Sequence, residues 1–167
     1  MIRRVAFKKA IFGGFAGAIA WELAARLMSA AGLRIFDLVY VLGSMIFEPP
    51  APVWKWWLTG LATHCLVGAT WAIFYGYFFW STFDCRPILQ GTIFSLLPAA
   101  LAGAIMVPQL NLMHPDLLPR LGPFAVGIGI GGPVMIVGGH IIYGAVLGRI
   151  YVRPVGYPAG KRISLNA

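Results

Sequence analysis

The stretch His140-Ile-Ile-Tyr-Gly-Ala-Val-Leu-Gly-Arg-Ile-Tyr151 decides how the rest of this chain is interpreted. A second stretch, His64-Cys-Leu-Val-Gly-Ala-Thr-Trp-Ala-Ile-Phe-Tyr75, repeats its histidine, the glycine four residues later and the tyrosine eleven residues later. These spacings place the three residues on one helix face, because an α-helix turns once every ~3.6 residues. The two stretches start 76 residues apart in a chain of 167, which suggests two related halves, 10–80 and 88–152.

The composition is that of a membrane protein. Hydrophobic residues make up 59% of the chain and charged residues only 11%, with a mean hydropathy of +0.80. A soluble domain carries about 25% charged residues. The net charge of +8 does not indicate nucleic-acid binding, because most of the cations lie at the two ends of the chain. We therefore expect one all-α integral membrane domain over residues 1–167, with no nucleic-acid partner.

Four apolar runs are long enough to cross a bilayer, which takes about 20 helical residues. The expected membrane-spanning helices cover residues 10–28, 57–80, 88–108 and 133–152. Pro98 lies inside the third helix and should kink it, because proline lacks an amide donor.

Three segments between these helices are harder to assign. Residues 33–47 are too short to span, and we expect an interfacial helix on the outer side. Residues 109–121, which include His114, should form an outer loop. The glycine-rich segment 122–132 either extends the last helix or forms a separate short element.

The distribution of lysine and arginine predicts the topology. Nine of the thirteen fall on one side of the proposed membrane, and three fall on the other. Because cytoplasmic segments carry the excess of basic residues, we expect both termini, including the basic tail 153–167, in the cytoplasm. The resulting arrangement allows the two halves to be parallel repeats of a two-helix unit.

Small residues recur every four positions along several of the expected helices. Such stripes let helix backbones approach closely, so they predict helix packing. The glycines assigned to this role are Gly60, Gly68, Gly76, Gly91, Gly103, Gly144 and Gly148.

Glu22 and Arg26 are separated by one helical turn, so we expect them to form an intramembrane ion pair. Charged groups at membrane depth are costly unless they are paired or face protein. The alternative is a proton-handling or ligand-binding role for Glu22.

His64 and His140 are the candidate cofactor-binding residues. If the halves are parallel repeats, both lie at similar depth and could ligate a haem b between them, with Gly68 and Gly144 leaving room for the macrocycle. They could instead hydrogen-bond a quinone or lipid, or simply join neighbouring helices. No metal site or disulfide is expected, because Cys65 and Cys85 lie about a helix length apart. We expect no cofactor unless the haem hypothesis holds.

The pattern His-x-x-x-Gly-x-x-x-Gly-x-x-Tyr from His140 to Tyr151, with the earlier His64-x-x-x-Gly68, resembles small bacterial four-helix inner-membrane proteins of the YagU-like and related families of unknown function. The resemblance implies a multi-pass protein of the bacterial inner membrane without assigned catalysis. It transfers no catalytic residues to this chain.

The sequence carries none of the common enzyme motifs, such as a Walker loop, GxSxG or HExxH. We therefore expect a non-enzymatic accessory or structural subunit of a larger bacterial membrane complex of respiratory or photosynthetic type. Its partners would be membrane lipid and other membrane-protein subunits. The alternatives are a haem b- or quinone-binding electron-transfer protein and a small oligomeric channel or transporter.

Overall fold

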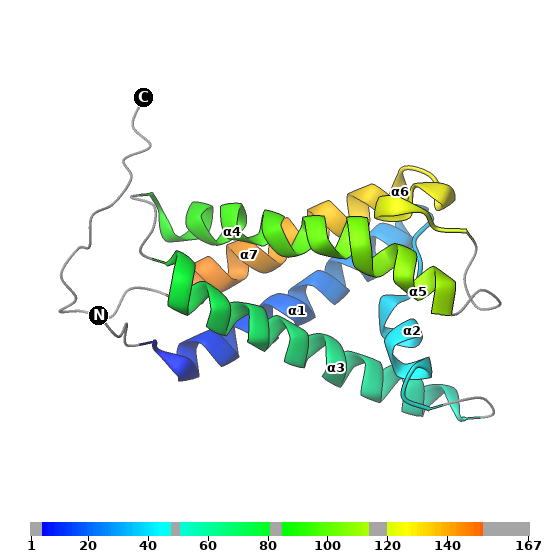
Figure 1. Cartoon of the computed structure of the whole chain (residues 1–167), viewed down its shortest axis with the longest axis horizontal. Coiled ribbons are helices and arrows are strands. Elements are labelled where there is room, and N and C mark those ends of the chain that lie inside the picture. The colour runs from blue at the N-terminus through cyan, green and yellow to red at the C-terminus, as the bar shows by residue number, and fades with distance from the viewer. Residues whose placement is uncertain (1–4, 48–50, 81–84, 114–119, 152–167) are drawn as a thin grey trace.

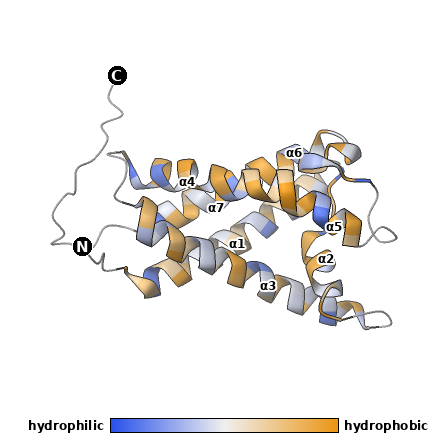
Figure 2. Cartoon of the chain, viewed as in Figure 1, coloured by the Kyte–Doolittle hydropathy of each residue, from blue (hydrophilic) through white to orange (hydrophobic). Residues whose placement is uncertain are grey.

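The computed structural model describes residues 5–47, 51–80, 85–113 and 120–151. Over this part of the chain the regular structure is helical, without strands (Figure 1). Four helical stretches are long and apolar enough to cross a membrane: Phe7–Ala30, Val53–Phe79, Pro87–Leu110 and Gly131–Ile150. The chain is therefore an all-helical, multi-pass membrane protein, as the apolar runs predicted. Figure 2 shows hydrophobic residues along most of the length of these helices.

The first span is the single helix α1, Phe7–Ala30, whereas the other three each combine α-helix with a π-helical turn. The second consists of α3, Val53–Phe74, and η1, Tyr75–Phe79. The third consists of α4, Pro87–Leu101; η2, Ala102–Met106; and α5, Val107–Met113. The fourth consists of α6, Gly131–Pro133; η4, Val134–Gly138; and α7, Gly139–Ile150.

The central pair of helices is α1 and α7, which pack against each other. Helix α3 packs on α1, and helix α4 packs on α7, so α3 and α4 are the outer members of the bundle. The short connection between α3 and α4 would by itself favour side-by-side packing of these two helices. Figure 1 shows instead that they diverge away from that connection, and the short helix α2, Leu38–Ser44, packs on the far part of α3.

Two glycine crossings set the distances between these helices. A Cβ atom built on Gly14 of α1 would lie less than 3.0 Å from the backbone of Gly68 in α3. A Cβ atom on Gly91 of α4 would lie equally close to the backbone of Gly144 in α7. Real Cβ atoms essentially never approach this closely, so only glycine permits either crossing.

The third span is longer than predicted. We expected it to end at Pro108, but helix continues to Met113, so the loop predicted from residue 109 is wrong in its first part. The π-helical turn η2 directly precedes Val107 and Pro108. A wider turn accommodates a proline because it relieves the clash between the ring and the preceding turn of helix. His114 lies outside the described residues.

The other two segments between the predicted spans, residues 33–47 and 122–132, form short elements. Residues 33–47 are helical only over α2, and the Asp37 carboxylate caps this helix by accepting a hydrogen bond from the Tyr40 amide at 3.1 Å. Most of the glycine-rich segment forms a separate turn, η3, Pro123–Ile128, and its last two residues, Gly131 and Gly132, begin the fourth span. Phe124 and Ala125 within it adopt positive φ angles of 52° and 56°, a region that side-chain-bearing residues rarely occupy.

Candidate functional site

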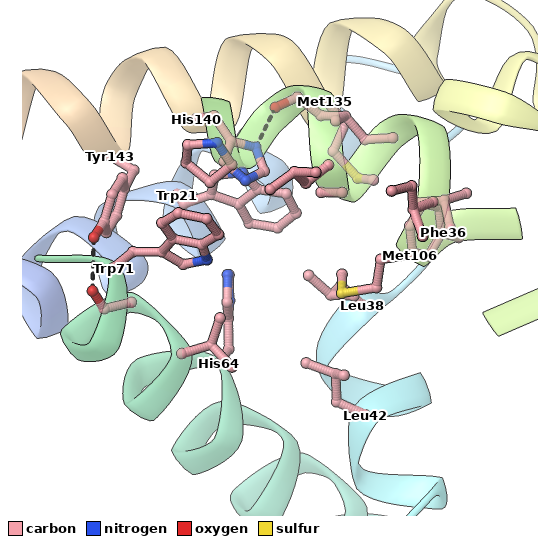
Figure 3. A pocket seen from close by; sticks show the side chains of 18 residues that line it. Trp21, Phe36, Leu38, Leu42, His64, Trp71, Met106, Met135, His140 and Tyr143 are labelled. Carbon is pink, nitrogen blue, oxygen red and sulfur yellow. Dashed lines mark hydrogen bonds between the residues drawn. The ribbon is translucent and has the colours of Figure 1, made fainter. Parts of the chain in front are cut away.

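The divergence of the outer helices is accompanied by a cavity of about 340 Å³ within the bundle. All four spans line it, together with residues of α2 and the loop before it. Most of the lining side chains are aliphatic, methionine or aromatic, including Trp21, Phe36 and Trp71. Figure 3 shows His64 reaching the cavity from α3, and His140 and Tyr143 reaching it from the α7 side. The cavity therefore brings together the two histidines that the repeated stretches singled out.

His140 has a defined hydrogen-bonding state. Its Nδ1 lies 2.6 Å from the carbonyl oxygen of Ile136, one turn earlier in the same span. A carbonyl oxygen only accepts, so Nδ1 must carry a proton and donate it. Among the described residues no carboxylate contacts His140, and a lone cation at membrane depth is costly, so the ring is neutral. Its Nε2 therefore presents a lone pair.

His64 is bound to a carboxylate from the neighbouring helix. Its Nδ1 lies 2.7 Å from Oε1 of Glu22 in α1, and the Glu22 side chain is only 9% exposed. This contact fixes the His64 ring and satisfies one oxygen of a buried acid. The sequence reasoning missed this partner because the two residues lie 42 positions apart.

Arg26 makes its main contact with Asp37 rather than with Glu22. Its Nη1 and Nη2 donate to the two Asp37 carboxylate oxygens at 3.0 and 2.9 Å, whereas Nη2 lies 3.8 Å from Glu22 Oε2. The guanidinium also stacks 4.2 Å from the ring centre of Trp57. A chain of charged and polar groups thus leads from the loop before α2 to the cavity, through Asp37, Arg26, Glu22 and His64.

Two aromatic residues complete the site. The Trp21 ring lies edge-on to the rings of His64 and His140, with centroid distances of 5.0 and 6.4 Å. The Tyr143 hydroxyl donates a 2.6 Å hydrogen bond to the carbonyl oxygen of Gly68, joining α7 to α3. Tyr143 follows His140 by three residues, a helical spacing that could have indicated a shared face.

The seven glycines assigned to helix packing all contact another segment of this same chain. Gly68 and Gly91 make the two crossings described above, with Gly144 as the partner of Gly91. The others face the following residues: Gly60 faces Val39, Gly76 faces Tyr151, Gly103 faces Phe124 and Gly148 faces Pro87.

The space beside Gly144 is filled, which bears on the haem hypothesis. A Cβ atom there would lie 2.5 Å from the Ser95 hydroxyl oxygen, and Gly144 does not line the cavity, although Gly68 does. The expected symmetrical gap beneath both histidines is therefore absent around Gly144. Within the described residues no cluster of three histidine, cysteine or acidic side chains could hold a metal ion.

No family model matches the chain, and no curated protein or solved structure is significantly similar to it.

Proposed function

We propose that this protein binds a membrane-soluble small molecule of the quinone class in the cavity between its helices. The observation that carries the proposal is an apolar cavity, within the membrane-spanning helices, that is lined by two imidazole rings, each held through its Nδ1. Ligand sites commonly combine an apolar lining with a few polar groups that orient the ligand. Trp21 and Trp71 offer aromatic surface to a ring-shaped headgroup, and the aliphatic lining suits its hydrocarbon tail.

A role as an accessory subunit of a larger membrane complex remains a prediction. It rested on two features of the sequence: the small-residue stripes, which could have served contacts with other subunits, and the small part of the chain that lies outside the membrane. Because the seven glycines contact segments of the same chain, these stripes are accounted for without a partner. The cavity is the feature that internal packing does not explain, so ligand binding is the better-supported function.

Haem b binding is the second candidate. Metal-ligating histidines usually engage their second ring nitrogen in a hydrogen bond, and both His64 and His140 do so. However, Trp21 packs against both rings, and Ser95 fills the space at Gly144, so a macrocycle would have to displace packed groups. A reduced-minus-oxidised absorption spectrum of the gently purified protein tests this candidate, since haem b gives a signal that His64→Ala and His140→Ala would abolish.

We also propose that the chain contains two parallel repeats in the bacterial inner membrane, with both termini in the cytoplasm. The glycine crossings support the repeat, because Gly14 meets Gly68 in the first half and Gly91 meets Gly144 in the second. The partners correspond at offsets of 77 and 76 residues, the second of which also separates the two histidines. The location and orientation rest on the distribution of basic residues and on the family resemblance.

Binding can be tested by titrating the protein in lipid nanodiscs with decyl-benzoquinone, which quenches nearby tryptophans. Ala102 lines the cavity, whereas Ala104, two residues later in η2, is exposed and does not line it. Ala102→Phe should fill the cavity and abolish saturable quenching, while the matched control Ala104→Phe should behave like the wild type. Non-saturable quenching that is the same in all three proteins would mean that the quinone only partitions into the lipid, and it would overturn the proposal.

A further inference from the structure

We infer that the cavity selects the hydroxyl-bearing, reduced form of its ligand, a quinol or related phenol, over the carbonyl-bearing quinone. This inference rests on the proposed function and names the chemical form of the ligand. It follows from counting which polar atoms at the cavity can accept a hydrogen bond and which can donate one.

His140 contributes an acceptor. Its Nδ1 proton is committed to the Ile136 carbonyl oxygen at 2.6 Å, and the opposite tautomer would set two lone pairs against each other at that distance. The Nε2 lone pair has no hydrogen-bond partner among the described residues. A ligand in the cavity that brings a donor satisfies this lone pair, and a ligand that lacks one leaves it unpaired.

His64 contributes a second acceptor when its ring is neutral. Its Nδ1 donates to Glu22 Oε1 at 2.7 Å, which leaves the Nε2 lone pair without a partner in the described chain. The other charged groups of this chain of contacts are Arg26, 3.8 Å from the second Glu22 oxygen, and Asp37, which is bound to Arg26.

Donors at the cavity are fewer. The Tyr143 hydroxyl is used by the Gly68 carbonyl oxygen, and the Trp21 indole nitrogen is packed against Gly139. Among the described side chains that line the cavity, only the indole nitrogen of Trp71 remains as a donor, and Figure 3 shows it on the cavity side. A quinone carbonyl could accept from Trp71 but would leave both imidazole acceptors unpaired. A hydroxyl group can pair with both kinds of cavity group, because it donates to an imidazole and accepts from the indole.

The test compares matched ligands with and without a hydroxyl proton. Octylphenol and octylanisole share ring and tail, but the methyl ether cannot donate. We expect the wild-type protein in nanodiscs, measured by titration calorimetry with empty nanodiscs subtracted, to bind octylphenol roughly tenfold or more tightly, since an unpaired buried acceptor is costly. The redox pair duroquinol and duroquinone, measured anaerobically, should give the same order of affinity.

A second experiment uses a variant to test whether His140 provides the selectivity. His140→Phe keeps an aromatic ring but removes the acceptor, so the preference for octylphenol should shrink several-fold while octylanisole binding changes little. Equal affinities for phenol and ether in the wild type, both abolished by Ala102→Phe, would overturn the selectivity and leave cavity binding intact. Absence of saturable binding by both ligands would instead refute the cavity site, and the selectivity with it. The wild-type comparison decides the inference even if His140→Phe fails to fold.

Discussion

The two cavity histidines differ in what their removal leaves behind. His64 is the direct partner of a buried carboxylate, whereas His140 bonds a carbonyl oxygen of its own helical span. Loss of His64 leaves the Glu22 carboxylate without its nearest hydrogen-bond partner. Its remaining charged neighbour, Arg26, lies 3.8 Å away and is already bound to Asp37. The same substitution at the two positions therefore has different expected costs.

His64→Phe should reduce the free energy of unfolding by about 1.5–3 kcal/mol, the usual contribution of a hydrogen bond to a charged group, because it leaves one oxygen of the buried Glu22 carboxylate without its donor. His140→Phe should cost only about 0.5–1.5 kcal/mol, because it removes one local hydrogen bond between uncharged groups. Reversible unfolding in mixed detergent micelles measures both values. Adding Glu22→Leu to His64→Phe should recover part of the loss; strictly additive effects would show that Glu22 and His64 do not interact.

At the scale of helices, backbone contact at glycine determines which helices are neighbours. The α4–α7 pair is held at Gly91, where a Cβ atom would meet the backbones of Gly144 and Gly148. Gly138, in the same span as Gly144, has one described neighbour near its Cβ position, the Met28 side chain at 3.5 Å. Gly91 and Gly138 are therefore matched positions at which the same substitution to alanine can be compared.

Gly91→Ala should destabilise the protein by about 1–3 kcal/mol or more, because the added methyl group forces the two helices apart. Gly138→Ala should be neutral or slightly stabilising, since alanine favours helix more than glycine does. Unfolding in detergent measures both changes. A Gly91→Ala variant as stable as Gly138→Ala would contradict the close α4–α7 crossing.

The divergence of α3 and α4 could not be predicted from hydropathy. The number of spans follows from apolar runs of bilayer length, and it was predicted correctly. The rotation of each helix about its own axis cannot be predicted in the same way, because residues that face lipid are as apolar as residues that face the core. Three features of the site depend on how each helix is rotated about its own axis: the pairing of Glu22 with His64, the contact between Arg26 and Asp37, and the cavity. His64 and His140 could still be singled out, because polar residues are rare in such helices.

The whole molecule should have both termini in the cytoplasm. A fluorescent-protein fusion at either end should therefore fluoresce, and an alkaline phosphatase fusion at either end should be inactive, because phosphatase requires export. Phosphatase inserted between residues 114 and 119 should be active. An active fusion at one terminus alone would require an odd number of spans and would contradict the topology.

The most direct test of the cavity's role is the amount of quinone that copurifies with the protein from bacterial membranes. Wild-type protein and the two variants Ala102→Phe and Ala104→Phe would be purified in mild detergent, extracted with organic solvent, and assayed for quinone and quinol by mass spectrometry. We expect close to one such molecule per wild-type or Ala104→Phe chain, and far less with Ala102→Phe. Equal amounts in all three preparations, or none in the wild type, would contradict it.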